Sequence, residues 1–243
     1  ERPEGPKSHL KKAGTPSLGG VILLGALVPG VLLAAGEGLA AALPCLLVTV
    51  AFGLVGFVDD SMKIRRKSAQ GLPVWQKVLL QFALSLGAAL YLFFSGQVGP
   101  VVGLPLSGGV WNMGVLYIPF AVLVLMGTVN GVNLTDGLDG LASSVTVLVA
   151  TFFTVVAIGT KSGIEPITCA VVGALLGFLL FNVYPAKVFM GDTGSLALGG
   201  FVAGTAYVMQ MPLFILIVGL IYLIEVLSVI IQVTYFKATH GKR

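Results

Sequence analysis

Charged residues are scarce in this chain, and the scarcity narrows its class. Only 10% of the 243 residues are Asp, Glu, Lys or Arg, whereas 56% are hydrophobic. One soluble core of this length cannot enclose so much apolar surface, so we expect an integral membrane protein. No soluble part is left to hold nucleic acid. Because repeats, low-complexity tracts and linkers are also missing, we expect one domain over residues 1–243.

Cysteine and histidine are rarer still. Cys45 and Cys169 lie in apolar segments without neighbouring His or Cys, so they predict neither a metal site nor a disulfide, and we interpret them as small core residues. His9 and His240 are expected to be surface residues. No Ser-His-Asp or Cys-His arrangement indicates acyl transfer, nothing indicates a redox cofactor, and no Walker or Rossmann glycine pattern indicates a soluble nucleotide-binding fold.

Long apolar segments are abundant instead. Their lengths suit a hydrocarbon layer of about 30 Å, which predicts an all-α, polytopic transmembrane helix bundle. The eight predicted segments are Ser17 to Ala35, Ala40 to Val58, Trp75 to Ser95, Met113 to Val129, Leu138 to Ile158, Ile167 to Tyr184, Ser195 to Met211 and Leu213 to Phe236.

Basic residues are distributed unevenly when these segments are threaded alternately through a membrane. Of the fourteen Lys and Arg residues, thirteen fall on one side and only Lys161 falls on the other. The positive-inside rule makes the basic side cytoplasmic. All five aspartates share this side, while the loop 96–112 on the other side carries no charge. We therefore expect an active face that looks into the cytoplasm.

The first acidic segment ends the second apolar stretch with the pair Asp59 and Asp60. Acids are disfavoured at a helix C-terminus because the helix dipole is negative there, so a function explains them better than a cap or a pair with Lys63. Adjacent helical residues point about 100° apart, which predicts different tasks for the two carboxylates. The basic run 63–67 sets topology, and it could also steer an anionic substrate.

The second acidic segment spans residues 130–142 and contains Asp136 and Asp139, together with two Asn and three Gly residues. Thr135 or Asp136 could simply cap the next helix, with Asp139 in its first turn. Alternatively, the backbone N–H groups of this loop could approach a phosphate or a hydrated cation. Both interpretations stay open from the residues alone.

The third acidic segment, residues 185–195, contains Asp192 between Gly191 and Thr193. Asp192 could be an ordinary N-cap, but the glycines also permit close backbone approach. Taken together, the three segments predict a Mg²⁺ site that neutralises phosphates at the membrane surface, because Mg²⁺ prefers carboxylate oxygens and bridges substrate phosphates. Fixed positive charge would come from Lys63, Lys67, Lys77 and Lys187.

Four ordered motifs resemble those of the polyprenyl-phosphate N-acetylhexosamine 1-phosphate transferases, and the likeness covers nearly the whole chain. The motifs are residues 12–20, the Asp59-Asp60 pair, residues 133–140 and residues 188–196. The family has ten membrane helices, so the eight segments imply a trimmed piece with one more helix at each end. The family's His-rich motif would follow residue 243, which gives His240 no catalytic role.

The resemblance also implies an activity at the bacterial plasma membrane. Phospho-N-acetylmuramoyl-pentapeptide would pass from its UDP carrier to undecaprenyl phosphate, giving lipid I for peptidoglycan and releasing UMP. Thr135 and residues 189–195 favour this reaction over that of a sibling that uses another UDP-sugar. The implied partners are UDP-N-acetylmuramoyl-pentapeptide, undecaprenyl phosphate and membrane lipid. The oligomeric state, a homodimer included, stays open.

The matching motifs imply roles for individual residues. Asp192 would be the main Mg²⁺ ligand, and Asp59 would be a base or a nucleophile. Asp60 would position metal or phosphate, and Asp136 would be a further catalytic or nucleoside-binding acid. The implied substrate-binding residues are Lys12, Thr15, Lys67, Lys77, Asn130, Asn133, Asp139, Asn182, Phe189 and Gly191.

A secondary transporter is the competing hypothesis from another class. Helices interrupted by Gly and Pro suit a translocation path, and Glu225 lies within the last apolar segment. Transport sites normally lie near the bilayer midplane, whereas the charge here is concentrated at one surface. This placement favours the enzyme. Glu225 could serve a function or simply face a polar groove, and we give it no role.

Overall fold

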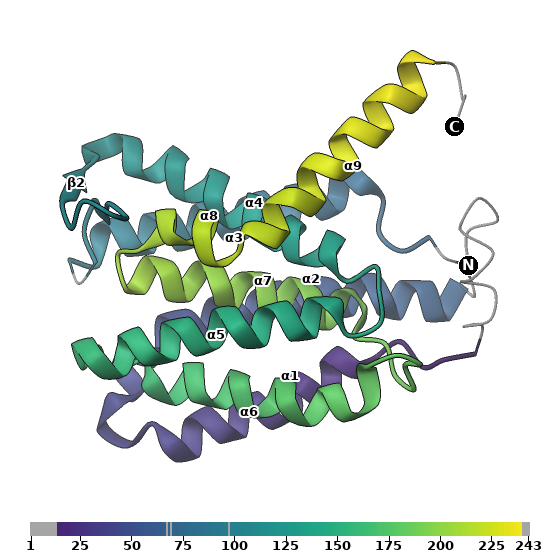
Figure 1. Ribbon diagram of the computed structural model, residues 1–243, viewed down its shortest axis with the longest axis horizontal. Coiled ribbons are helices and arrows are strands. Elements are labelled where there is room, and N and C mark those ends of the chain that lie inside the picture. Colours follow the sequence, from purple (N-terminus) through teal and green to yellow (C-terminus); the bar gives the residue numbers. More distant parts are fainter. Residues whose placement is uncertain (1–13, 67, 69, 97, 240–243) are drawn as a thin grey trace.

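The computed structural model describes residues 14–66, 68, 70–96 and 98–239, and Figure 1 shows them as a helical bundle with one short β-hairpin. The helices in chain order are α1 (Gly19–Ala34), the 3-10 helix η2 (Gly36–Gly38), α2 (Leu39–Arg66), α3 (Val74–Phe94), the 3-10 helix η3 (Gly114–Leu116), α4 (Tyr117–Thr135), α5 (Leu141–Thr160), α6 (Glu165–Asn182), α7 (Gly191–Val208), the 3-10 helix η4 (Pro212–Phe214), α8 (Ile215–Val218) and α9 (Leu220–Ala238). The predicted all-α fold class is confirmed.

Six helices among the described residues are long and apolar enough to cross a membrane, namely α2, α3, α4 together with η3, α5, α6 and α9. Helix α1 is apolar but only 16 residues long. Helix α7 is different, because its residues from Thr193 through Tyr207 are all buried. A helix enclosed by other helices needs small residues for close packing rather than a lipid-facing apolar surface.

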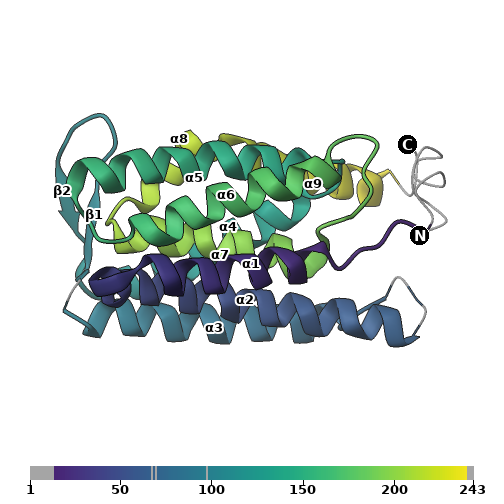
Figure 2. The ribbon, with the colours of Figure 1, turned by 90° about the horizontal axis from the view of Figure 1, so that it is seen from below.

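Helix α7 forms the axis of the bundle. Figure 2 shows α2 and α3 along one side of it and α5 and α6 along the other. Glycines on α7 let its neighbours approach closely: a Cβ on Gly199 would meet the backbone of Val129 in α4, and one on Gly200 would meet Phe52 in α2. The first turn of α7 is therefore held among several other helices.

Helix α2 extends further than the sequence predicts. Its apolar stretch was expected to end at Val58, but the helix continues to Arg66, so Asp59 and Asp60 lie within the helix and not in a loop. Its 28 residues give a length of about 42 Å, which exceeds a hydrocarbon layer of about 30 Å. The last turns can thus leave the apolar layer while the backbone stays helical.

The boundaries of α4 and α7 need the same correction. Helix α4 was expected to end at Val129 and ends at Thr135, so Asn133 is helical. Helix α7 was expected to begin at Ser195 and begins at Gly191, so Asp192 lies in its first turn. A segment predicted from hydropathy ends where polar residues begin, whereas the backbone hydrogen bonds of the helix continue through those residues.

The last predicted segment is broken in two. Helix α8 ends at Val218, and a Cβ on the following Gly219 would meet the ring of Tyr222. Helix α9 then leaves the bundle at an angle (Figure 1), and Tyr222 is its one buried residue. The Tyr222 hydroxyl lies 2.8 Å from Thr146 Oγ1 of α5, which anchors the base of α9.

A β-hairpin that the sequence did not predict joins α3 to α4. Strand β1 (Val101–Gly103) pairs antiparallel with β2 (Val110–Asn112), and Val102 lies opposite Trp111. The backbone N–H of Gly103 donates to the carbonyl of Gln210 (2.7 Å), which attaches the hairpin to the end of α7. The hairpin thereby closes the end of the bundle opposite the acidic residues.

Candidate active site

The site lies where α2 ends, α3 begins, α4 ends and α7 begins. Asp59 and Asp60 come from α2, and only 3% and 4% of their surfaces are exposed. Asp192 comes from the first turn of α7. One carboxylate oxygen from each of these three residues lies within 4.8 Å of the others. Segments separated by more than 130 positions in the sequence are thus brought to one point.

The ammonium group of Lys63 occupies the centre of this acidic cluster. Its Nζ lies 2.6 Å from Asp59 Oδ2, 3.2 Å from Asp60 Oδ1 and 2.9 Å from Asp192 Oδ2. Lys77 of α3 also contacts Asp192 Oδ2, at 2.7 Å. Three carboxylates thus face two ammonium groups, which leaves the cluster with one net negative charge.

The second oxygens of Asp59 and Asp60 have a structural task. The backbone N–H of Leu72 donates to Asp59 Oδ1 (2.7 Å), which folds the α2–α3 loop over this carboxylate. Thr193 donates to Asp60 Oδ2 through its backbone N–H (2.8 Å) and its hydroxyl (2.7 Å). Asp60 therefore satisfies a free N–H at the start of α7 from outside that helix. In each case one oxygen anchors the fold while the other faces Lys63.

Asp192 is not the N-cap that the sequence allowed. The N-cap position of α7 is Met190, whose own side chain forms no capping hydrogen bond. Asp192 instead binds the two lysines with Oδ2 and accepts a hydrogen bond from Asn133 Nδ2 on Oδ1 (2.9 Å). Asn133 Nδ2 also lies 2.8 Å from Ser195 Oγ. Groups from α2, α3 and α4 therefore fix this carboxylate.

Glycines make this convergence possible. A Cβ on Gly56 of α2 would collide with the backbone carbonyl of Asp192. Gly191 has φ of 73°, a left-handed conformation, and a Cβ there would meet the Ser17 carbonyl and the Asp60 carboxylate. Gly191 also lines the adjoining cavity, and its lack of a side chain permits this close approach of the backbone.

A polar cavity of about 320 Å³ opens beside the cluster. The site residues that line it are Asp60, Lys63, Asn133, Asp136, Asp139, Asn182, Phe189, Gly191 and Asp192. This volume falls within the range of about 300–1,000 Å³ that small-molecule sites occupy. The structure thus brings most of the predicted site residues to one cavity.

Asp136 also lines this cavity, and it is partly buried. It follows the end of α4, and no hydrogen bond or ion pair to its side chain occurs among the described residues. Burial, together with the nearby charges of Asp192 and Asp60, raises the pKa of Asp136 to about 8. A cation or a hydrogen-bond donor on the substrate would favour its ionised form.

Asn182, Asp139 and Phe189 form the far wall of the cavity. Asn182 is buried, accepts from Ser143 Oγ (2.8 Å) and donates to the carbonyl of Val188 (2.9 Å). Asp139 accepts from the backbone N–H of Ala186 (3.1 Å). The two polar loops are thereby tied to each other. Thr15 lies half-buried just before the strand-like pairing of residues 16–20 with residues 189–190.

Asn130 lies apart from the cavity. Its amide donates to Gln81 Oε1 and to the carbonyl of Met126, both at 2.8 Å, so it joins α4 to α3. Gln81 is one turn beyond Lys77, and Asn130 is nearly one turn before Asn133. This amide bridge therefore holds together the two helices that reach Asp192. Lys12 and Lys67, also predicted for the site, lie outside the described residues.

Sequence reasoning undervalued three residues here. Lys63 was expected to supply positive charge or to pair with one aspartate, yet it contacts all three carboxylates, and its i+3 and i+4 spacing from the Asp pair signals two of these contacts. Thr193 and Ser195 were not among the predicted site residues, yet they hydrogen-bond with Asp60 and Asn133. Their partners lie on other helices, so no local pattern could have revealed them.

The donor set suits a hard divalent cation. Mg²⁺ binds carboxylate oxygens and retains waters, and three such oxygens converge where the Lys63 ammonium now stands. Asp59, Asp60 and Asp192 would hold such an ion, with Lys63 turned aside. A bound Mg²⁺ would polarise phosphoryl oxygens and neutralise their charge.

Apolar helices long enough to cross a membrane, with clustered carboxylates and lysines beside a polar cavity, are typical of membrane enzymes that act on phosphorylated substrates. The sequence model of glycosyl transferase family 4 matches residues 42–211, and the chain belongs to this family.

The chain is also similar over its whole length to proteins named phospho-N-acetylmuramoyl-pentapeptide-transferase. It is 47% identical over 243 residues to the protein from Clostridium novyi (strain NT), covering 100% of this chain and 74% of that relative. It is 49% identical to the protein from Clostridium perfringens (strain 13 / Type A), covering 100% of this chain and 76% of the relative. The resemblance inferred from the four motifs is confirmed.

Proposed function

We propose that this chain transfers phospho-N-acetylmuramoyl-pentapeptide from its UDP carrier to undecaprenyl phosphate, which gives lipid I and UMP. The observation that carries the proposal is the meeting of Asp59, Asp60 and Asp192 around one cation position beside a polar cavity. The names of the relatives that match this chain from end to end supply the substrate.

The bond changes of this reaction are simple. An oxygen on the lipid phosphate forms a bond to the sugar-linked phosphorus, and the bond from that phosphorus to the UMP oxygen breaks. Little covalent chemistry is required of the protein, so positioning and charge stabilisation provide most of the catalysis. Lys63 and Lys77 lie where they can neutralise phosphate charge, and Mg²⁺ would assist them.

Asp59 is suited to act on the acceptor. Its Oδ1 is held by the Leu72 N–H, which leaves Oδ2 to face the centre of the site. Oδ2 can take a proton from the lipid phosphate, or attack the sugar-linked phosphorus first and pass it on to the lipid. Asp136, on the cavity wall, is placed to accept a hydrogen bond from the nucleoside.

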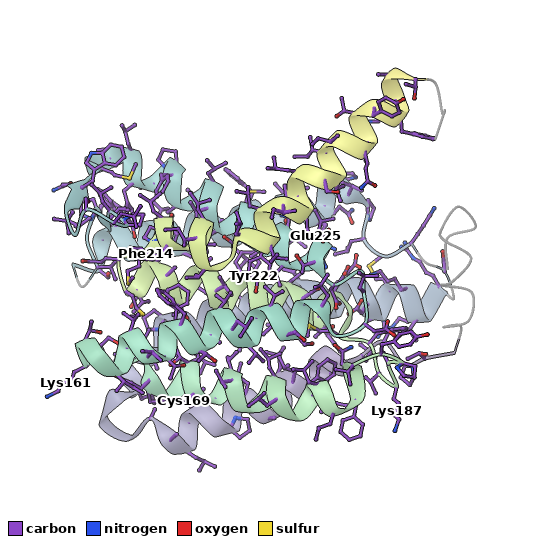
Figure 3. The ribbon with its side chains drawn as sticks, in the orientation of Figure 1. Lys161, Cys169, Lys187, Phe214, Tyr222 and Glu225 are labelled. Atoms are coloured by element: carbon purple, nitrogen blue, oxygen red, sulfur yellow. The ribbon has the colours of Figure 1, made fainter. Side chains whose placement is uncertain are left out.

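The cavity faces the cytoplasm of a bacterial plasma membrane in this proposal. Figure 3 shows Lys187 at the end of the bundle where α6 runs toward α7, and Lys161 at the opposite end. Most other basic residues of the described chain belong to the Lys187 end, since they lie at the end of α2, the start of α3 and the end of α9. The positive-inside rule assigns that end to the cytoplasm.

Purified protein in detergent tests the function directly. It should release UMP from UDP-N-acetylmuramoyl-pentapeptide only when undecaprenyl phosphate is present, and lipid I should form in equal amount. UDP-N-acetylglucosamine in place of the first substrate is the matched control for a sibling activity. Turnover without sealed vesicles excludes a transporter, while the absence of both UMP and lipid I under all these conditions would reject the proposal.

A further inference from the structure

The β1–β2 hairpin and its connections form an uncharged segment at the end of the bundle opposite the cavity. Residues 95–116 contain no Asp, Glu, Lys or Arg, although they carry the chain from α3 to α4 around that end. Several of their apolar side chains are nevertheless exposed, namely Leu106, Val110, Trp111, Val115 and Leu116. An exposed apolar patch of this kind marks contact with a membrane or with another protein.

Hydrogen bonds hold the hairpin against the end of α7. The carbonyl of Gln210 accepts from the backbone N–H of Gly103 (2.7 Å), and the side-chain amide of Gln210 donates to the Val98 carbonyl. In Figure 2 both strands run crosswise to the helices. Because the helices cross the membrane, the hairpin lies roughly parallel to the membrane plane, at the level of the helix ends.

One face of the hairpin is directed toward the bundle. Val102 is fully buried and belongs to the apolar cluster that includes Tyr117 and Tyr207. Trp111 lies directly opposite Val102 in the ladder, so its ring projects from the same face. Yet 51% of Trp111 is exposed, because β2 extends past the edge of the bundle. Part of the indole therefore faces the level of the helix ends with no described residue covering it.

The two tryptophans of the sequence mark the two ends of the apolar layer. Trp75 is exposed at the start of α3, whose 21 residues give a length of about 31 Å, close to the hydrocarbon thickness of about 30 Å. Trp111 lies at the other end and precedes the apolar span Gly114–Thr135 by three residues. Tryptophan is enriched at both membrane interfaces, because its ring is apolar while its N–H stays hydrated. Trp111 is thus placed at the depth of a lipid head group.

The tip of the hairpin carries a strained apolar residue. Leu106 has φ of 71°, a left-handed conformation that a leucine adopts only at a steric cost. Its side chain is fully exposed, so packing within the described chain does not offset that cost. Contact with lipid would offset it, since the side chain would then leave water.

We propose that the hairpin rests on the lipid head-group layer of the membrane leaflet opposite the cavity, with Trp111 as its anchor and Leu106 inserted beside it. The partner is a phospholipid surface of any charge, because residues 95–116 offer no charge that would select anionic head groups. Such an anchor fixes the depth and tilt of α3 and α4 in the bilayer. The contact is independent of the transfer reaction, since the hairpin and Asp192 lie at opposite ends of α7.

The fluorescence of single tryptophans in lipid nanodiscs tests the contact, because nanodiscs leave both membrane faces open to the solution. Trp75→Phe leaves Trp111 as the only tryptophan. Its emission should be quenched strongly by lipids brominated near the head group, weakly by lipids brominated deep in the acyl chain, and little by acrylamide in solution. The pattern should be the same in phosphatidylcholine and in phosphatidylglycerol. Trp111→Phe, which leaves Trp75, provides the reference for the other membrane face.

Position 110 provides the matched control. Val110 precedes Trp111 in β2 and projects from the opposite face of the hairpin. Val110→Trp, combined with Trp75→Phe and Trp111→Phe, should be quenched far more by acrylamide and far less by brominated lipids. Equal responses of the tryptophans at the two positions would overturn the proposed orientation.

Two results for Trp111 would reject the contact itself. Strong quenching by acrylamide without quenching by any brominated lipid would place the hairpin in water. Protection from both quenchers would assign the patch to a contact with protein, either a second copy or another chain. Neither result depends on turnover, so the proposed function and the proposed contact can fail separately.

Leu106 variants test the tip. Leu106→Asn suits the left-handed backbone but removes the apolar surface, so Trp111 should lose much of its protection from acrylamide. Leu106→Met keeps the apolar surface and should retain the protection. Thermal unfolding in detergent checks that both variants are folded. Unchanged protection of Trp111 in Leu106→Asn would exclude Leu106 from the membrane contact.

Discussion

At one end of the bundle the β1–β2 hairpin joins α3 to α4, and at the other end the α2–α3 loop passes over Asp59. Both connections must satisfy backbone groups outside helices. The hairpin end does so mainly with other backbone groups, through β1–β2 pairing and the bond from Gly103 to Gln210. The cavity end uses carboxylates, since Asp59, Asp60 and Asp139 each accept from a backbone N–H.

The difference explains how a membrane protein can keep buried aspartates. A buried carboxylate is costly unless hydrogen bonds and opposite charges compensate it. At the cavity end one oxygen of Asp59 and one of Asp60 receive a backbone donor, and the other oxygen of each faces Lys63. The same carboxylates therefore shape the loops and create the charged centre, whereas the hairpin shapes its end without charge.

Removing metal should give the largest effect at the cavity end. We expect excess EDTA to abolish UMP release and added Mg²⁺ to restore it, because the oxygens of Asp59, Asp60 and Asp192 lie close enough together to hold one ion. Asp192→Asn should lose activity and not regain it with Mg²⁺, since the amide keeps the shape but not the charge. Full turnover in EDTA would contradict the metal assignment.

Variants of Asp59 distinguish the catalytic role of this carboxylate from its structural role. Asp59→Asn and Asp59→Ala should both lose activity by about 10²-fold to 10⁴-fold, the range for general acid–base catalysis. Only Asp59→Ala should also lower the thermal stability, because the amide oxygen can still accept from Leu72. Trp111→Ala, at an exposed position of the hairpin, is the control and should change neither quantity. Equal stability of the two Asp59 variants would show that the Leu72 bond contributes nothing.

Lys63 should show opposite effects on metal binding and turnover. Lys63→Met removes the ammonium that occupies the cation position, so Mg²⁺ should bind more tightly. The kcat should fall by about 10²-fold, as when one electrostatic group is lost from a catalytic site. Calorimetric titration with Mg²⁺ and a kinetic assay measure the two effects. Weaker Mg²⁺ binding in the variant would mean that Lys63 supports the metal rather than competing with it.

Gly56 tests the close contact of α2 with the start of α7. Gly56→Ala should destabilise the protein by about 1–3 kcal/mol, because its Cβ collides with the Asp192 backbone. Gly87→Ala, where a Cβ meets nothing within 4 Å, should stabilise slightly through helix propensity. Thermal unfolding in detergent compares them. Equal unfolding temperatures would show that the α2–α7 contact is not tight.

Asp136 predicts a pH dependence of the metal-free protein. Because burial raises its pKa to about 8, the folded state favours the protonated form. Its contribution to stability is complete below the pKa of the unfolded chain, about 4, and is lost as pH rises through about 8. The unfolding temperature should therefore fall more steeply between about pH 4 and pH 8, the two pKa values, in the wild type than in Asp136→Asn. Parallel curves would exclude this role for Asp136.

The sequence by itself determined the class and the location of the chemistry. The lengths of its apolar segments fix helices that cross a membrane, because the hydrocarbon layer has a set thickness. Its one-sided charge gathers all five aspartates at one end. These properties depend on composition and on the order of residues along the chain, so they can be inferred without the tertiary structure.

Only the tertiary structure decided which polar groups meet. Lys63 at the centre of three carboxylates, Asp192 as a held ligand rather than a helix cap, and Asn130 outside the cavity all depend on contacts between distant segments. The burial of α7 and the position of the hairpin across the end of the bundle depend on how whole segments pack. Helical periodicity specifies the face on which a residue lies, but the packing of other helices against that face determines its partner.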